Sequence, residues 1–183
     1  MIETFVHDRA GPARTRGRTT VDEASFTALF NAHYGPLVRL AGLLGADDPE
    51  DIAQDAFARY YRRRRRLRDD AAAFAYLRST VCNLTRNRRR HLGVVRRALP
   101  VLFARTEEDV PADFTAMVRE DHRELLAALD ALPAKQREVL VLRYWMDLSE
   151  REIGKVMGIS AGTVKSHAHR AVAALQGSLR EKA

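Results

Sequence analysis

The stretch LSEREIGKVMGISAGTVKSHAHRA, residues 148–171, has the residue types that a pair of helices needs to bind DNA. In a helix-turn-helix, a small residue lets the two helices approach closely, and the turn takes a residue that tolerates positive φ. Gly154 and Gly158 stand at these positions, and Ser160 suits the N-cap of the second helix. The apolar residues that would lock the pair are Ile153, Met157, Ile159 and Val164. The spacing therefore predicts a helix-turn-helix and contact with duplex DNA.

The second helix of this pair would enter the major groove with its outward face. Its inward positions are apolar, namely Val164, Ala168, Ala171 and Leu175. The outward positions offer cations for phosphates or a guanine edge, and hydroxyl and imidazole groups that reach bases. They are Thr163, Lys165, Ser166, His169 and Arg170.

Positive charge is concentrated upstream of this motif. The chain has 183 residues and a net charge of +7, which favours an anionic partner. Residues 59–97 hold 14 Arg and no Lys against two Asp, a local balance of +12, so the remainder of the chain carries −5. A basic block on an otherwise acidic protein indicates a binding site.

Within that block, one predicted helix face combines an aromatic ring, two amides and two cations. These residues are Tyr76, Asn83, Arg86, Asn87 and Arg90. Stacking, base-edge hydrogen bonds and backbone charge are what single-strand binding requires. A purely electrostatic face for duplex DNA is the competing interpretation.

Helical periodicity predicts an all-α protein of two small domains joined by a flexible linker. The first would be a three- or four-helix domain, and the second would contain the helix-turn-helix. In the second domain, Leu125, Leu126, Leu129 and Leu132 are expected to mark a buried side. The predicted boundaries are 1–22 for a flexible tail, 23–97 for the first domain, 98–118 for the linker and 119–183 for the second domain.

A second helix of the first domain has a clear start. Gly45 is a natural stop for the helix before it, Asp48 is a suitable N-cap, and Pro49 fits the first helical position. Its apolar stripe is expected at Ile52, Ala53, Ala56, Phe57 and Tyr60. Asp51, Gln54 and Asp55 fall on another face, which would point to solvent or a partner.

Other classes of function find little support in these residues. The acidic residues near position 50 stand at a helix start, where carboxylates are expected for capping, so no metal site or cofactor is predicted. No nucleophile-and-base arrangement indicates an enzyme. The single Cys82 is interpreted as a small packed residue. With no signal peptide and no run of 18 apolar residues, we expect a cytoplasmic protein without membrane insertion.

Both halves resemble the bacterial extracytoplasmic-function (ECF) sigma factors, the small two-domain type of the sigma-70 family, and in their Arg content the actinobacterial members. PEDIAQDAFARYY and AYLRSTVCNLTRNRRR are similar to sigma region 2. LPAKQREVLVLRYWMDLSEREIG and the helix-turn-helix after it look like region 4. The resemblance covers roughly residues 24–177 and implies a factor that directs promoter-specific transcription initiation.

The resemblance also implies partners and roles. Asp51, Gln54 and Asp55 match the face that docks on the clamp helices of the polymerase largest subunit, and region 4 would contact the flap. The face with Asn83, Arg86 and Asn87 would melt the promoter −10 element. Ser160 and the outward residues of the second helix would read the −35 duplex. A specific anti-sigma factor is an expected partner.

The chain departs from the family pattern at two places. Tyr76 is nearest to where the family has a Trp ahead of the melting helix, and His167 and Ala168 replace a common Arg-Leu pair. The alternative interpretation is a response-regulator-type activator, because TVKSH also resembles the end of that family's DNA-binding domain. Such proteins usually carry a receiver domain of alternating strands and helices, and no strand pattern is present here.

Overall fold

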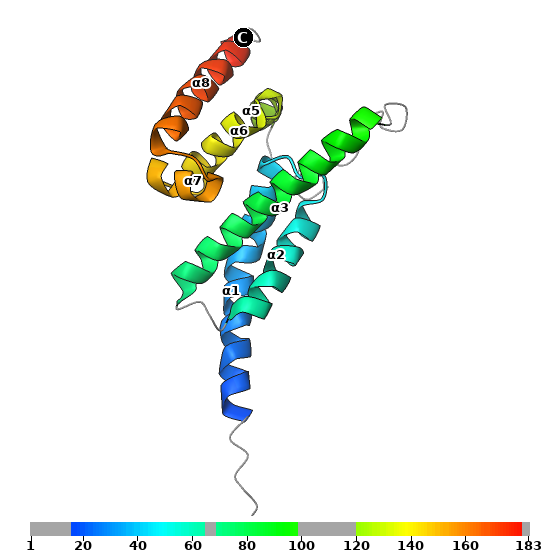
Figure 1. Cartoon of the computed structure of the whole chain (residues 1–183), viewed down its shortest axis with the longest axis vertical. Coiled ribbons are helices and arrows are strands. Elements are labelled where there is room, and N and C mark those ends of the chain that lie inside the picture. The colour runs from blue at the N-terminus through cyan, green and yellow to red at the C-terminus, as the bar shows by residue number, and fades with distance from the viewer. Residues whose placement is uncertain (1–15, 65–68, 99–119, 181–183) are drawn as a thin grey trace, which may run out of the picture.

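The structure, a computed structural model, describes residues 16–64, 69–98 and 120–180. Every regular element in these ranges is helical, which confirms the predicted all-α class (Figure 1). The predicted linker lies almost wholly outside the described residues. The elements are α1 (Arg16–Leu43), α2 (Pro49–Arg63), α3 (Asp70–Ala98), α5 (Glu120–Ala131), α6 (Ala134–Leu140), the π-helical turn η3 (Val141–Trp145), α7 (Glu150–Met157) and α8 (Ala161–Arg180).

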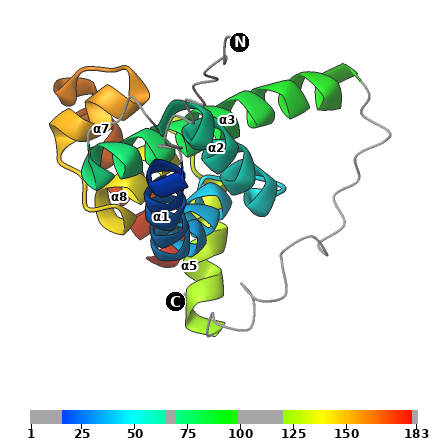
Figure 2. The same cartoon turned by 90° about the horizontal axis from the view of Figure 1, so that it is seen from below.

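Helices α1, α2 and α3 form an N-terminal unit in which each packs against the other two. Its centre is apolar, and Leu37, Leu40, Leu77 and Val81 are completely buried. The expected stripe of α2 is confirmed, because Ile52, Ala53, Ala56, Phe57 and Tyr60 are all buried. The C-terminal end of α3 projects away from the other helices in both views (Figures 1 and 2).

The predicted tail is wrong for residues 16–22, because α1 begins at Arg16. Those residues have no apolar periodicity, which is why the sequence indicated a tail. Once a helix has nucleated, each added residue gains a backbone hydrogen bond without a further nucleation cost. Helix α1 therefore extends beyond its amphipathic part. Residues 1–15 lie outside the described part of the chain.

The predicted start of α2 is confirmed in detail. The backbone N–H of Asp51 donates to the Asp48 carboxylate at 3.1 Å, and Pro49 occupies the first turn. Gly45, in the connection before it, has φ of 81°. That left-handed conformation suits glycine, so Gly45 ends α1 as expected.

In the C-terminal unit, α8 packs against α5, α6 and α7. Leu132 and Leu140 are buried together with Ala171 of α8. The expectation for Leu125 is wrong, since this residue is 38% exposed. Leu125 shares a face with Ala128 and Leu132 but stands nearer the start of α5, at the margin of the packed surface.

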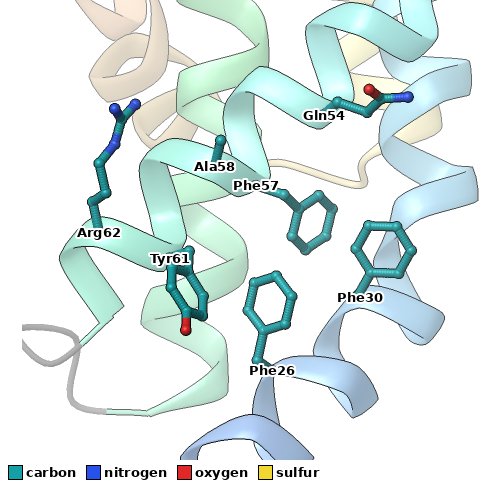
Figure 3. Close-up of a pocket in the computed structure, with 7 residues that line it drawn as sticks. All are labelled: Phe26, Phe30, Gln54, Phe57, Ala58, Tyr61 and Arg62. Carbon is teal, nitrogen blue, oxygen red and sulfur yellow. The ribbon is translucent and has the colours of Figure 1, made fainter.

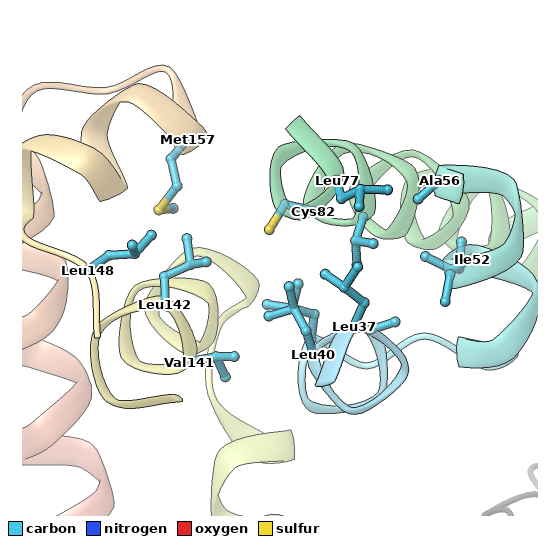
Figure 4. Close-up of a cluster of buried hydrophobic side chains, with 14 of the residues drawn as sticks. Leu37, Leu40, Ile52, Ala56, Leu77, Cys82, Val141, Leu142, Leu148 and Met157 are labelled. Atoms are coloured by element: carbon cyan, nitrogen blue, oxygen red, sulfur yellow. The ribbon is translucent and has the colours of Figure 1, made fainter. Parts of the chain in front are cut away.

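The two units pack against each other instead of standing apart on a tether. One cluster of buried residues includes Leu37, Leu40 and Cys82 from the N-terminal unit and Leu142 and Met157 from the C-terminal unit (Figure 4). Between the units, η3 contacts α1, and the Val156 carbonyl of α7 accepts a hydrogen bond from Arg86 of α3. The sequence predicted two separate cores, because periodicity shows that a face is buried but not against which partner.

Candidate nucleic-acid and protein interfaces

The helix-turn-helix is held by local contacts at both of its helix starts. Ser149 and Glu152 form a capping box on α7, in which the Ser149 N–H donates to the Glu152 carboxylate at 2.9 Å. These hydrogen bonds hold the pKa of Glu152 below its ordinary value. At α8, the N–H of Thr163 donates to the Ser160 hydroxyl at 3.1 Å, which confirms Ser160 as the N-cap.

The two glycines of the motif have the predicted roles. Gly158 has φ of 68° and ends α7 in the left-handed conformation. At Gly154, an added Cβ would stand only 2.7 Å from the carbonyl oxygen of Ile159, so a small residue is required. Ile153 and Val164 are completely buried between the helices. This packing sets which face of α8 is outward.

All five predicted outward residues of α8 are exposed, namely Thr163, Lys165, Ser166, His169 and Arg170. The hydroxyl groups form hydrogen bonds within the first turns of α8. Ser160 and Thr163 share one of 2.8 Å, and Ser166 donates to the Gly162 carbonyl at 3.1 Å. The predicted inward residues agree as well, with Val164, Ala168 and Ala171 buried.

His167, which departs from the family pattern, is half-buried at the side of α8. Burial lowers its pKa, and the nearby positive charges of Arg170 and Lys135 lower it further. His167 is therefore neutral at neutral pH and adds no charge to the outward face. Its neighbour Ala168 fills a buried position.

A basic groove beside the turn was not predicted from the sequence. It has a volume of about 520 Å³ and runs from α7 to the N-terminus of α8. Arg151 and Lys155 stand one turn apart on its α7 side, and both are exposed. Two cations one helical turn apart on the helix that precedes α8 are the sequence feature by which this groove could be recognised.

On α3, four residues of the predicted single-strand-binding face remain accessible, and the fifth contacts the C-terminal unit. Asn83, Asn87 and Arg90 are exposed, and Tyr76 is half-buried with the Arg63 guanidinium 6.0 Å from its ring centroid. Arg86 differs from the other four because it turns toward the C-terminal unit. One of its nitrogens donates to the Val156 carbonyl at 3.0 Å. The sequence could not predict this contact, since Val156 lies 70 positions further along the chain.

The acidic face of α2 is accessible, and its charges are paired. Asp51 and Gln54 are exposed, and Asp55 is half-exposed. Asp51 forms an ion pair with Arg88 of α3 at 3.0 Å, and Asp55 pairs with Arg59 at 3.0 Å. The hydrogen bonds that the Arg59 guanidinium donates to the Asp55 carboxylate raise the pKa of Arg59 above its ordinary value. A partner that binds this face therefore meets charges already held in place.

Next to Gln54, an aromatic hollow of about 420 Å³ opens between α1 and α2 (Figure 3). The rings of Phe26 and Tyr61 meet edge to face at 5.2 Å, and those of Phe30 and Phe57 are 4.9 Å apart. Tyr61 is 42% exposed. The sequence placed Phe57 in the apolar stripe of α2 but did not predict the hollow, because it arises only when two helices meet.

Neither a metal site nor a membrane helix is found where the structure describes the chain. In residues 16–64, 69–98 and 120–180, no group of three or more His, Cys, Asp or Glu side chains is placed to hold a metal ion. None of the described helices is long and apolar enough to cross a bilayer.

In residues 16–64, 69–98 and 120–180, an exposed helix-turn-helix and a second helix bearing cations and amides are features of a DNA-binding transcription protein. Residues 122–175 match the family described as Sigma-70, region 4. The RNA polymerase sigma-E factor of Streptomyces coelicolor is 37% identical over 145 residues, which cover 78% of this chain and 79% of that relative. The ECF RNA polymerase sigma factor SigM of Mycobacterium tuberculosis is 33% identical over 172 residues, which cover 92% of this chain and 84% of the relative.

A solved structure has the same fold. It is the sigma factor RpoE from Bartonella quintana in complex with the anti-sigma factor NepR, with a TM-score of 0.71 and 23% identity. The match covers 85% of this chain and 97% of that chain. The chain belongs to the ECF RNA polymerase sigma factors of the sigma-70 family. It is a sigma factor that binds core RNA polymerase and directs transcription initiation at specific promoters.

Proposed function

We propose that α8 reads the −35 element of the promoter as duplex DNA. Lys165 and Arg170 contact phosphates or a guanine edge, and Ser166 and His169 reach bases in the major groove. Ser160 and Thr163 contact the DNA backbone at the N-terminus of α8. Arg151 and Lys155 bind the adjacent phosphates. The exposure of all these side chains on one side of the motif supports the assignment.

The N-terminal unit then opens and holds the −10 element. An unpaired base has to be stabilised outside the stack, because unstacking costs a few kcal/mol. Asn83 and Asn87 supply amides for base edges, Arg86 and Arg90 supply charge for the backbone, and Tyr76 supplies a ring for stacking. These five residues share one face of α3, with Arg86 at its edge toward the C-terminal unit.

The polymerase-docking surface is the acidic face of α2. Asp51, Gln54 and Asp55 bind the clamp helices of the largest subunit, and the aromatic hollow beside Gln54 receives an apolar side chain from the same surface. Carboxylates would repel DNA, so an acidic face on a DNA-binding unit favours a protein partner. The C-terminal unit contacts the polymerase flap.

The remaining assignments follow from this role. We place the protein in the cytoplasm with the polymerase and assign it no catalytic step and no cofactor. An anti-sigma factor is a proposed partner, supported by the solved complex of an RpoE of this fold with NepR. The response-regulator-type activator needs a receiver domain, whereas residues 16–64 and 69–98 form three helices.

One observation carries the proposal: a single chain presents two separate helices suited to DNA, α3 with amides and an aromatic ring and α8 within a helix-turn-helix. The test is transcription by core RNA polymerase from pooled genomic fragments, with mapping of the new 5′ ends. Addition of the protein should create start sites that core polymerase alone ignores. Tight duplex binding by the protein alone, without any new start site, would favour an activator instead.

Two sets of substitutions separate the assigned roles. Asn83→Ala combined with Asn87→Ala should reduce promoter opening, seen as permanganate reactivity of unpaired thymines, and leave duplex binding unchanged. Lys165→Ala combined with Arg170→Ala should weaken duplex binding itself. If both sets had the same effect on duplex binding, the assignment of promoter opening to α3 and duplex binding to α8 would be wrong.

A further inference from the structure

Two aromatic side chains of the C-terminal unit are exposed on the π-helical turn η3. Tyr144 is 72% exposed and Trp145 is 46% exposed, and no large hydrophobic side chain among the described residues is more accessible than these two. No contact proposed above uses either ring. Single exposed apolar residues are common on protein surfaces, whereas neighbouring exposed rings indicate a contact site.

The turn itself holds both rings outward. Leu142 and Leu148, on either side of the pair, are buried, and the Leu148 N–H donates to the Leu142 carbonyl at 3.1 Å. The Arg143 guanidinium pairs with the Glu150 carboxylate at 3.3 Å, which ties the turn to the start of α7. The exposure of the two rings therefore follows from an anchored backbone and not from a loose chain end.

The backbone after the rings has an uncommon conformation. Asp147 has φ of 50° and is the one residue other than glycine with a positive φ in the described ranges 16–64, 69–98 and 120–180. The turn before it is π-helical, a form that is rare in proteins and frequent at functional sites. Backbone strain of this kind persists where the surrounding structure enforces it, and it is concentrated at binding sites. The two rings are thus presented in a preorganised arrangement, which lowers the entropic cost of binding.

A cation of the N-terminal unit lies beside these rings. The Arg39 guanidinium of α1 is 6.0 Å from the centroid of the Trp145 ring. No carboxylate within the described part of the chain forms an ion pair with Arg39. Its charge is therefore available to an anion next to the ring. Arg39 and Trp145 belong to different units, so only the packed chain brings them together.

Aromatic rings beside a cation match the chemistry of single-stranded nucleic acid. Unpaired bases stack on exposed rings, and the phosphates between them interact with cationic side chains. Duplex DNA fits less well, because its bases already stack on one another and offer no free faces. The net charge of +7 also favours a polyanion as the ligand.

We propose that Tyr144, Trp145 and Arg39 form a site for single-stranded nucleic acid that is separate from the −10-binding face of α3. Unpaired bases stack on the two rings, and Arg39 binds an adjoining phosphate. RNA and DNA share this chemistry, since stacking and charge do not distinguish the 2′-hydroxyl. The site does not depend on the assignment of α3 to the −10 element.

Trp145 is a natural probe of this site. It is the only tryptophan of the chain, so the tryptophan emission comes from this position alone. Stacking of a base on the indole quenches that emission. The test titrates the full chain at low salt with an unlabelled mixed-sequence strand of roughly 12 nucleotides, as single-stranded DNA, as single-stranded RNA and as duplex DNA.

Both single strands should quench the emission to a plateau, and the duplex should bind without comparable quenching. Quenching by RNA at roughly tenfold lower concentration than by DNA would identify RNA as the ligand, and equal curves would mean that either strand binds. If neither single strand changed the emission, the proposal would be overturned and the rings would be assigned to a protein partner.

Tyr144→Ala should raise the concentration needed for half-maximal quenching roughly tenfold, because it removes a ring on which a base stacks. Tyr144→Phe keeps the ring and should stay within roughly twofold of wild type. Since Tyr144 is exposed, both variants should keep the helix content that circular dichroism measures. Equal weakening in the two variants would contradict stacking at this position.

A second pair of variants tests the cation. Arg39→Gln should weaken binding roughly fivefold by removing a phosphate contact, measured by the same quenching. The matched control is Lys135→Gln, which removes the same charge from an exposed position on α6 and should change binding less. Equal weakening by both variants would show an effect of net charge and would overturn the assignment of Arg39 to the site.

The quenching test is independent of the proposed promoter contacts. Asn83→Ala combined with Asn87→Ala should impair promoter opening and leave the quenching curve unchanged. Loss of quenching in that variant would place the strand on α3 and overturn the proposal. Failure of the proposed function would instead appear as an absence of new start sites in transcription while quenching is intact.

Discussion

A Cβ placed on Gly154 would stand 2.7 Å from the carbonyl oxygen of Ile159, and this approach sets the angle between α7 and the turn that leads into α8. The oxygen belongs to the backbone and cannot turn aside as a flexible side chain would. The orientation of α8 therefore depends on a glycine of α7.

Gly154→Ala should destabilise the protein by about 1–3 kcal/mol, because the added methyl group forces the two segments apart. The measurement is the free energy of unfolding from urea denaturation. Gly177→Ala is the matched control, since a Cβ at this helical glycine meets nothing within 4 Å. The control should be neutral or gain up to about 1 kcal/mol. Equal stability of the two variants would show that the close approach is not required.

Replacement of both Asp51 and Asp55 by Arg should abolish binding to core RNA polymerase and leave the fold intact. The ion pairs that these residues make with Arg88 and Arg59 are exposed, and exposed pairs contribute at most about 1 kcal/mol each. Binding is measured by co-elution with core polymerase, and folding by circular dichroism.

A charge swap distinguishes docking from internal pairing. Asp51→Arg with Arg88→Asp restores the pair within the chain but reverses the charge that a partner meets. It should remain folded and still bind polymerase poorly. Full binding by the swapped variant would mean that Asp51 acts only within the chain.

The stability contributed by Glu138 should fall as the pH rises. Burial raises the pKa of this carboxyl above its ordinary value of 4.5, so the folded chain favours the protonated form. The contribution is complete below the unfolded pKa and is lost as the pH rises through the folded pKa. Glu138→Gln stays neutral throughout.

The Glu138→Gln variant should therefore gain stability relative to wild type as the pH rises above the unfolded pKa of the carboxyl. Urea unfolding of both proteins at each pH gives the difference, in which the titration of other groups cancels. A difference that did not change with pH would show that the environment of Glu138 is not as desolvated as its burial indicates.

Lys155→Ala should weaken binding to mixed-sequence duplex DNA and lower the slope of log K against log salt by about 1, if Lys155 neutralises one phosphate. Fluorescence anisotropy across a salt series measures both quantities. Lys135→Ala removes the same charge from an exposed position on α6, away from the basic groove. An equal change in slope for both variants would indicate general charge loss and not a contact at the groove.

Local signals in the sequence determined most helix boundaries and the outward face of α8, which is proposed to bind DNA. The N-cap at Asp48, the left-handed turns at Gly45 and Gly158 and the small residue at Gly154 each act within a few positions, so their signals are complete in the chain itself. Helical period alone placed Val164 and Ala171 inward and Lys165 and Arg170 outward.

Tertiary structure alone decided what depends on distant segments. The aromatic hollow requires Phe26 and Tyr61 to meet across two helices, and Arg86 finds Val156 only after the units pack together. Periodicity marks a residue as buried or exposed, but it carries no information about which distant surface does the covering. For this reason the sequence predicted the two helical units, whereas only the fold shows that residues of both units share one buried cluster and that Arg86 of α3 donates to the Val156 carbonyl of α7.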